Sequence, residues 1–261
     1  MKLAAAIVGL FLVTSSTFAA MKTQTIEYKV GDTTCRGYLA YDDSTDAKRP
    51  GVIIVHEWWG LTDYPKRRAE QLAQLGYVAF CADMFGDGKT TSDPKEALQF
   101  VTELGKKPDA AAARTQAAVD ELKKQAQVDS TRLAAMGYCF GGATALNMAR
   151  AGMDLKGVVS FHGSLETNSP AKKDTLKAKV LVCHGAADPM VTTEHVQKFE
   201  KEMDAAGADW QVNVYAHAVH AFTNPDADKF KIPGVGYNAE ADRRSWKAMQ
   251  MFFDEIFGGA K

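Results

Sequence analysis

The sequence predicts an α/β fold in which helices cover both faces of a mostly parallel central sheet of about eight strands. Two observations carry this prediction. From Val52 onward, short apolar runs of β-type composition alternate with segments whose apolar residues recur at helical spacing. Two of these runs, 51–56 and 180–184, are almost entirely apolar, as strands buried on both faces are. With 261 residues, 46% of them apolar, the chain is long enough for one such domain with a large core.

The predicted elements follow one another in a simple order. Two strands at 25–30 and 35–41 form an opening hairpin around Gly31-Asp32. Later strands are predicted at 51–56, 132–136, 180–184 and 210–215. Helices are predicted at 63–75, 94–104, 109–127, 141–151, 192–206 and 239–257. The polar stretches 41–50, 86–94 and 168–173 are interpreted as surface connections within one domain, residues 21–261.

The most informative motif is Gly-Tyr-Cys-Phe-Gly-Gly at 137–142, which lies between a predicted strand and a predicted helix. A strand, a tight glycine-rich turn and a helix form the nucleophile elbow of α/β-hydrolases, usually written Gly-x-Ser-x-Gly. Here Cys139 occupies the reactive position. Residues packed against so tight a turn must be small, which explains Gly137, Gly141 and Gly142. The helix N-terminus points N–H groups at the sulfur and favours its thiolate. The motif alone also fits a buried cysteine before an ordinary turn.

A reactive thiol needs a base, and the base needs an acid that orients it. In α/β-hydrolases both follow the nucleophile in the chain, the acid first and the histidine second. Asp188 lies just past the carboxyl end of a predicted strand and fits the acid. His217 and His220 both lie in the loop after the next strand. We prefer His220 because of its distance from that strand, and His217 remains the alternative. Cys139, Asp188 and His220 together predict a catalytic triad.

The loop after the strand at 51–56 is expected to supply further parts of the site. In this fold the oxyanion hole uses the N–H after the nucleophile and one from the loop after the third strand. Those groups belong to Phe140 and Trp58. Glu57 then falls beside the nucleophile. A carboxylate between a strand and two tryptophans is predicted to handle a proton rather than to be a solvated loop residue.

Taken together, five motifs in this order resemble the dienelactone hydrolase family, the cysteine-using branch of the α/β-hydrolases. The resemblance runs from about Thr23 to Phe257 and rests on Glu57-Trp-Trp-Gly-Leu61, Gly76-Tyr-Val-Ala-Phe-Cys-Ala-Asp-Met84, Gly137-Tyr-Cys-Phe-Gly-Gly142, His184-Gly-Ala-Ala-Asp188 and His220-Ala-Phe222. It implies the same triad, with Glu57 hydrogen-bonded to the resting thiol. It also implies the opening of enol-lactones through a thioester intermediate, with no metal and no organic cofactor.

The chain departs from the family pattern where substrate charge is concerned. By the resemblance, arginines that bind a substrate carboxylate should fall near Asp87 and Asn224, and neither position is basic. Lys89 could replace one of them. His162 stands where a tyrosine is usual.

Aromatic residues near the motifs instead predict an apolar pocket. The pocket residues expected from the sequence are Trp59, Phe85, His162, Phe222 and Asn224. We therefore expect neutral esters or lactones to be preferred over anionic ones.

Charge and cysteine usage restrict the partners. A net charge of −1 and a pI of about 6.6 leave no basic footprint for nucleic acid. We expect a monomer whose partner is a small-molecule ester or lactone. Cys35, Cys81 and Cys183 lie in or at the ends of predicted strands and are interpreted as small buried apolar residues, with no disulfide partner fixed by the sequence.

The first 20 residues have the features of a secretory signal. Lys2 is followed by an apolar stretch at 3–13 that is too short to span a bilayer, and Thr17-Phe-Ala19 offers small residues for cleavage. The mature chain is therefore expected in the periplasm or outside the cell, with no membrane anchor. A translation start at Met21 would instead give a cytoplasmic enzyme.

Three function classes fit these observations. The leading one is a thiol hydrolase of lactones or small carboxylic esters, with a general carboxylesterase for neutral apolar esters as its variant. The second is a thiol redox protein, although the chain has no Cys-x-x-Cys. The third is a small-molecule binding protein on a hydrolase fold.

Overall fold

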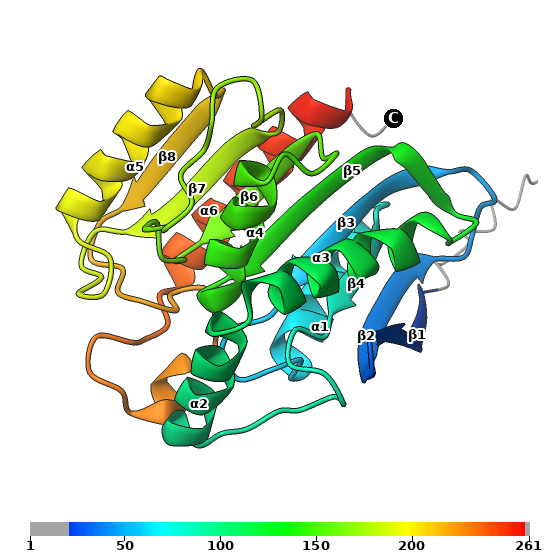
Figure 1. The fold of residues 1–261 in the computed structure, drawn as a ribbon, viewed down its shortest axis with the longest axis horizontal. Coiled ribbons are helices and arrows are strands. Elements are labelled where there is room, and N and C mark those ends of the chain that lie inside the picture. Colours follow the sequence, from blue (N-terminus) through cyan, green and yellow to red (C-terminus); the bar gives the residue numbers. More distant parts are fainter. Residues whose placement is uncertain (1–20, 259–261) are drawn as a thin grey trace, which may run out of the picture.

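The computed structural model describes residues 21–258, which form one eight-stranded sheet with helices on both faces (Figure 1). The strands are β1 (Met21–Val30), β2 (Thr33–Asp42), β3 (Arg49–Val55), β4 (Val78–Ala82), β5 (Val128–Tyr138), β6 (Gly157–Phe161), β7 (Lys179–Gly185) and β8 (Trp210–Tyr215). The helices are α1 (Asp63–Gln74), α2 (Pro94–Gly105), α3 (Pro108–Lys123), α4 (Phe140–Arg150), α5 (Thr193–Ala206), η1 (Ala227–Phe230, a 3₁₀ turn) and α6 (Ala239–Phe257). The predicted signal segment, residues 1–20, lies outside the described residues.

The sheet is mostly parallel, as predicted. Its strand order is β1-β2-β4-β3-β5-β6-β7-β8. β1 pairs antiparallel with β2, and β2 pairs antiparallel with β4. All the neighbouring strands from β4 to β8 run parallel. The parallel arrangement brings the carboxyl ends of β3, β5, β7 and β8 to one edge, where open α/β sheets bind their ligands.

The core has two layers, one on each face of the sheet. Alternate residues of β3 show this directly: Ile53 and Val55 pack with side chains of α3, α4 and α5, whereas Val52 and Ile54 pack with side chains of α1 and α6. In Figure 1 the first helix group lies in front of the sheet and the second behind it. Burial on both faces explains why this strand is an uninterrupted apolar run in the sequence.

Most predicted elements agree with the structure, although several of their boundaries differ from the prediction. The predicted helix 109–127 ends at Lys123, because Gln125 N–H donates to Leu122 O and Val128 N–H to Gln125 O, which turns the chain into β5. The stretch 41–50 is not wholly a surface connection, since both of its ends belong to strands β2 and β3. The opening hairpin around Gly31 is confirmed, with strands longer than predicted.

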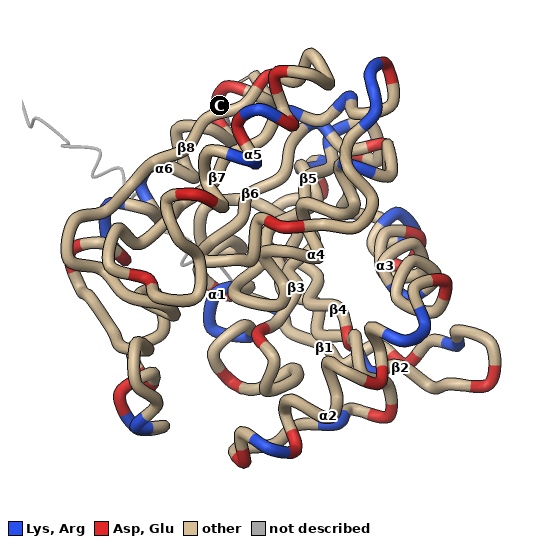
Figure 2. The backbone as a smooth tube through the Cα atoms, turned by 60° about the vertical axis from the view of Figure 1, so that its left-hand side comes forward, with Lys and Arg blue, Asp and Glu red and all other residues tan. Residues whose placement is uncertain are grey.

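Charged residues are distributed over the outside of the domain. Basic and acidic positions are interspersed along the described chain (Figure 2), in keeping with the net charge of −1. Within residues 21–258 no helix is both long and apolar enough to cross a bilayer.

Candidate active site

Cys139 lies on a sharp turn between β5 and α4, with backbone angles φ 55° and ψ −117°. A positive φ is strained for a non-glycine residue, so the surrounding packing must hold it. That packing is tight: a Cβ on Gly137 would lie 2.1 Å from Gly141 O, and one on Gly141 would lie 2.1 Å from Val55 O. The glycines therefore let the start of α4 sit directly against β3 and β5. This is the elbow geometry that the motif predicted.

His220 and Asp188 meet at the same edge of the sheet. Nδ1–H of His220 donates to Asp188 Oδ2 at 2.8 Å, and both side chains are buried. The other carboxylate oxygen of Asp188 accepts the backbone N–H groups of Met190, at 2.8 Å, and Val191, at 3.3 Å. These bonds fix the carboxylate, which in turn fixes the imidazole ring. His217, the alternative base, is exposed to solvent.

The surroundings of His220 favour its protonated form. Burial alone would lower its pKa, but the nearby sulfur of Cys139, the hydrogen bond to Asp188 and the charge of Asp188 together outweigh burial and raise the pKa of His220 to about 10. Because Nδ1 is bonded to Asp188, Nε2 is the ring atom left for the thiol. The structure thus places the three side chains as predicted: His220 lies in the same cavity as Cys139 and is hydrogen-bonded to Asp188.

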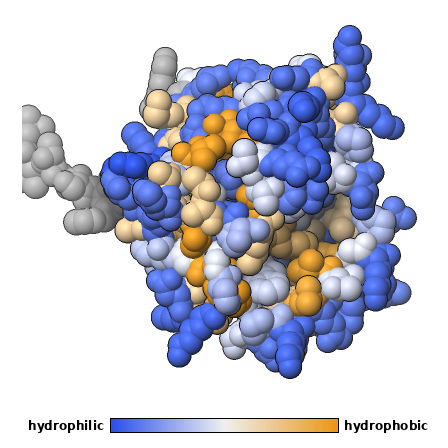
Figure 3. Space-filling view, turned by 90° about the vertical axis from the view of Figure 1, so that its left-hand side faces the viewer, coloured by the Kyte–Doolittle hydropathy of each residue, from blue (hydrophilic) through white to orange (hydrophobic). Residues whose placement is uncertain are grey.

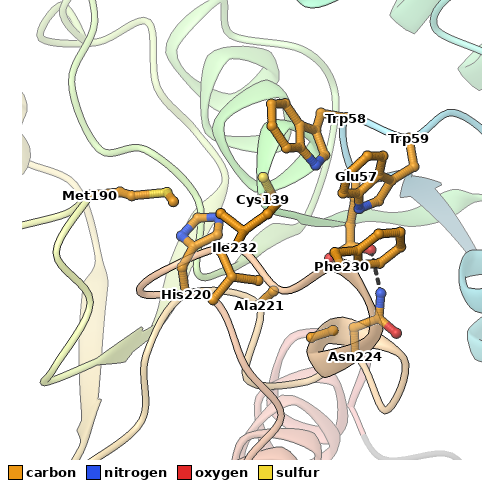
Figure 4. A pocket seen from close by; sticks show the side chains of 12 residues that line it. Glu57, Trp58, Trp59, Cys139, Met190, His220, Ala221, Asn224, Phe230 and Ile232 are labelled. Carbon is orange, nitrogen blue, oxygen red and sulfur yellow. Dashed lines mark hydrogen bonds between the residues drawn. The ribbon is translucent and has the colours of Figure 1, made fainter. Parts of the chain in front are cut away.

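Glu57 lies in the same site but is held by a residue other than Cys139. Asn224 Nδ2–H donates to Glu57 Oε2 at 2.6 Å, and both residues are buried (Figure 4). Burial raises the pKa of Glu57 to about 7, against the opposing effects of the Asn224 hydrogen bond and the positive charges of His220 and Arg68. The carboxyl group can therefore gain or lose a proton near neutral pH.

Phe140 and Trp58, the predicted oxyanion donors, lie in two chain segments next to Cys139. Phe140 is the first residue of α4, and the first N–H groups of a helix have no acceptor within the helix. Trp58 lies in the turn after β3, where Gly60 N–H donates to Glu57 O at 3.3 Å. The close contact between Gly141 and Val55 brings this turn against the start of α4.

These groups open into a small, mainly apolar cavity of about 160 Å³. Figure 4 shows Cys139 and His220 at its centre, with Trp58 above them and Met190 to one side. The full lining is Glu57, Trp58, Trp59, Cys139, Met190, His220, Ala221, Asn224, Ala227, Phe230, Ile232 and Val235. The side of the domain that carries the loop between β8 and α6 faces the reader in Figure 3, where apolar patches flank a hollow and hydrophilic side chains surround them.

One wall of the cavity is a loop segment that the sequence interpretation missed. We call residues 225–236 the strap. Phe230 of the strap stacks on Trp59, with ring centroids 4.1 Å apart and an interplanar angle of 14°. The strap is tied to His220 by two backbone bonds, from His220 N–H to Gly234 O and from Gly236 N–H to His220 O, each 3.0 Å long. A Cβ on Gly234 would lie 2.3 Å from Pro189, so the strap also packs against the Asp188 loop.

Three residues predicted for the pocket do not line it. Phe222 is fully buried and points into the core, because the positive φ of Ala221 (58°) turns the chain there. His162 lies beneath the elbow, where its Nδ1 accepts the backbone N–H of Cys139 at 3.1 Å and its Nε2 is 2.7 Å from Thr223 Oγ1. Phe85 packs against Phe140 and faces a different cavity.

Of the remaining predicted pocket residues, Trp59 and Asn224 do line the cavity. Asp87 and Lys89 line the second cavity with Phe85, so the position expected to hold an arginine lies away from the thiol. The lining residues that sequence reasoning missed are Met190, Ala221, Ala227, Phe230, Ile232 and Val235. The apolar residues at 230, 232 and 235 in an otherwise polar loop were a signal that could have found the strap.

Comparison with known proteins finds relatives described as dienelactone hydrolases or as similar to them. The family model described as "Dienelactone hydrolase family" matches residues 35–257. The chain belongs to this family. The family member described here is accordingly a carboxylic ester hydrolase with an α/β-hydrolase fold, as the resemblance implied.

Individual relatives agree with the family assignment. The solved structure of m3DLH is 40% identical, with a TM-score of 0.87 over 91% of this chain and 99% of that one. A dienelactone hydrolase-like promiscuous phosphotriesterase, P91 from metagenomic libraries, is 39% identical, with a TM-score of 0.86 over 92% and 99%. A protein of Aquifex aeolicus provisionally named carboxymethylenebutenolidase is 26% identical over 88% of this chain and 97% of its own length.

Proposed function

We propose that this protein hydrolyses small, neutral carboxylic esters or lactones with Cys139 as nucleophile, His220 as base and Asp188 as the residue that orients the base. The observation that carries the proposal is the buried 2.8 Å bond between His220 and Asp188 beside a thiol on a strained elbow. Nucleophile, base and orienting acid in this relation are the parts that covalent hydrolysis needs. The apolar lining of the cavity supports neutral substrates.

The first half of the reaction forms a thioester. Once the substrate is bound, Nε2 of His220 takes the proton of the Cys139 thiol, and the thiolate attacks the carbonyl carbon. The carbonyl π electrons move onto oxygen, which accepts hydrogen bonds from the N–H groups of Phe140 and Trp58. Each such donor stabilises the transition state by about 3 kcal/mol. When the intermediate collapses, the carbon–oxygen bond of the ester breaks and the alcohol oxygen takes the proton from His220.

The second half releases the acid. A water molecule attacks the thioester carbon while His220 takes one of its protons. Collapse of the new intermediate breaks the carbon–sulfur bond and releases the thiolate, which takes back the proton from the imidazole. Asp188 stays ionised and keeps the ring oriented through both halves. With a lactone, the alcohol formed in the first half stays attached to the acyl group.

A role for Glu57 in restraining the thiol is part of the proposal. Glu57 and Cys139 line the same cavity, and a carboxylate beside a thiol accepts its S–H bond and opposes its ionisation. We expect Glu57→Gln to increase the rate of Cys139 alkylation by iodoacetamide near neutral pH and to lower turnover. Mass spectrometry of the alkylated peptide measures the first effect. An alkylation rate equal to wild type at every pH would remove Glu57 from the mechanism.

The test of the main proposal is a panel of chromogenic esters and lactones, run with wild type and Cys139→Ala. We expect wild type to cleave neutral members and to accumulate a thioester that intact-mass spectrometry detects with slow substrates. Cleavage by Cys139→Ala at the wild-type rate would reject Cys139 as nucleophile. The redox alternative predicts reduction of peroxides instead. Cys35, Cys81 and Cys183 are fully buried, and within residues 21–258 Cys139 is the one cysteine that lines the cavity, which disfavours a resolving partner.

A second candidate activity is hydrolysis of phosphotriesters. The similarity to P91, 39% identical and named as a promiscuous phosphotriesterase, favours testing it. Diethyl p-nitrophenyl phosphate is a neutral substrate that suits an apolar site. Release of p-nitrophenol by wild type but not by Cys139→Ala would support this activity, and release by both at equal rates would reject it.

A further inference from the structure

The cavity has two unlike sides, separated by Cys139 and His220. In Figure 4, Glu57, Trp59, Phe230 and Asn224 lie on one side of Cys139, and Met190 lies on the other, beyond His220. The first side is closed by the stacked rings of Trp59 and Phe230. The second side is open, because 48% of Met190 is exposed to solvent.

The chemistry of ester cleavage decides which part of the substrate occupies each side. This step rests on the proposed function. The alcohol oxygen must take a proton from His220 as it leaves, so the alcohol part must lie on the His220 side. The carbonyl oxygen points to the N–H groups of Phe140 and Trp58. The acyl chain is then directed to the remaining side, towards Trp59 and Phe230.

We propose that Phe230 is the end wall of the acyl site and limits the length of the acyl chain, whereas the alcohol part extends past Met190 into solvent and is little restricted. Phe230 would thus be a specificity-determining residue, and the preferred substrates would be esters of short-chain carboxylic acids with alcohols of varied size. The proposal goes beyond the reaction itself, because it assigns the two halves of the substrate to the two sides of the cavity.

The size of the cavity agrees with a short acyl group. An apolar cavity of about 150 Å³ holds one benzene molecule. The cavity here has about the same volume, 160 Å³, and it must also hold the reacting carbonyl group. An acyl chain longer than about four to six carbon atoms would therefore have to displace a wall residue.

The wall is fixed in position rather than free to give way. The Phe230 ring lies flat on Trp59, a buried residue. At the start of the strap, Asp226 N–H donates to Asn224 Oδ1 at 2.9 Å, and the Asp226 carboxylate pairs with Arg67 at 2.9 Å. At its end, the bonds between His220 and residues 234 and 236 hold the strap. A wall held at both ends discriminates by length, because moving it breaks several contacts.

The experiment compares two substrate series in wild type, Phe230→Ala and Phe230→Leu. The first series is the p-nitrophenyl esters of acetate, butyrate, hexanoate and octanoate, which varies the acyl chain. The second is butyrate esters of methanol, butanol and hexanol, followed by acid release, which varies the alcohol. Phe100→Ala is the matched control, because Phe100 is also a half-buried ring but lines the second cavity. Circular dichroism checks that each variant is folded.

We expect kcat/KM of wild type to fall about tenfold or more from butyrate to octanoate, and this fall to shrink to about twofold in Phe230→Ala, with Phe230→Leu between them. The alcohol series should change little in any variant. An unchanged acyl profile in folded Phe230 variants would overturn the proposal, as would a change confined to the alcohol series or an equal change in Phe100→Ala. If wild type cleaves none of these esters, the proposed function fails and this inference fails with it.

Discussion

Two cavities lie in the loops around the elbow, and they differ in nearly every property. The first contains Cys139 and His220 and is mainly apolar. The second is about 220 Å³ in volume and is lined mostly by polar and charged residues: Thr33, Phe85, Asp87, Lys89, Phe100, Glu103, Leu104, Lys107, Ala110 and Arg114. An aromatic cluster of Phe85, His56 and Phe140 packs between the second cavity and the elbow, with ring centroids 4.8 to 6.1 Å apart.

The difference shows that nearness in sequence to a site motif does not place a residue in the site. Phe85 and Asp87 follow the carboxyl end of a parallel strand, as Glu57 and Trp59 do. The chain after β4 is nevertheless held elsewhere, since the buried carboxylate of Asp83 accepts the N–H groups of Phe85, Gly86 and Gly88. Charge at this second cavity should therefore have little influence on the chemistry at Cys139.

The largest expected effect is loss of activity in variants of the first cavity but not in a variant of the second. Cys139→Ala, Asp188→Asn and His220→Ala should each lower kcat/KM for a neutral chromogenic ester by about 10⁴-fold. Double variants should be little worse, because the members of the proposed triad are expected to act as a unit. Lys89→Ala, in the second cavity, and His217→Ala should stay near the wild-type rate. An inactive His217→Ala beside an active His220→Ala would mean that the base is misassigned.

The second prediction concerns stability against pH. Glu57 has an ordinary pKa of 4.5 that burial raises to about 7 in the folded chain. Between these pH values the unfolded carboxyl has lost its proton while the folded one keeps it, so stability falls as pH rises through this window. Glu57→Gln removes this loss. Denaturant unfolding measures this effect. Between pH 4 and pH 8 the free energy of unfolding of Glu57→Gln should rise relative to that of wild type by on the order of 3 kcal/mol.

Glu103→Gln supplies the control for that measurement, because Glu103 is an exposed carboxyl of the second cavity. Its stability should follow the wild-type curve. His220 also makes wild type lose stability at higher pH, since its folded pKa of about 10 lies above its ordinary value. That loss occurs in both proteins, and only the part that comes from the coupling between His220 and Glu57 remains in their difference. If the stability of wild type and of Glu57→Gln changed with pH in the same way, the pKa of Glu57 would not be raised in the folded protein.

The smallest predicted effect tests which cavity senses substrate charge. A matched pair of substrates, differing only in a carboxylate against its methyl ester, should be cleaved with higher kcat/KM in the neutral form. Asn224→Arg places a cation in the first cavity. It should reduce the difference in activation free energy between the two substrates, taken from kcat/KM, by about 1–3 kcal/mol. Asp87→Arg changes charge only in the second cavity and should leave the ratio of kcat/KM between the neutral and the anionic substrate unchanged. A wild-type preference for the anion, or a larger response to Asp87→Arg, would contradict the separation of the cavities.

The sequence was sufficient to place Cys139, Asp188 and His220 together because each follows a strand whose apolar run is unmistakable. The same reasoning assigned Phe222 to the pocket, which was wrong, and missed Phe230 of the same loop. The direction of Phe222 depends on the positive φ of Ala221, and the position of Phe230 depends on its stacking on Trp59, more than 150 positions away in the sequence. Such contacts arise only when the whole chain is folded. The extended helix prediction at 124–127 failed for a similar reason, since the start of β5 sets where α3 ends.

The backbone pairing of the strap with His220 also bears on which sequence changes the fold can accept. Because Gly234 and Gly236 are hydrogen-bonded to His220 itself, inserting or deleting one residue near them would shift the pairing and move the imidazole. The packing of Gly234 on Pro189 extends the same restriction to the Asp188 loop. Relatives with other substrate ranges are thus expected to differ by exchanged side chains at positions 227, 230 and 232 more often than by a longer or shorter strap.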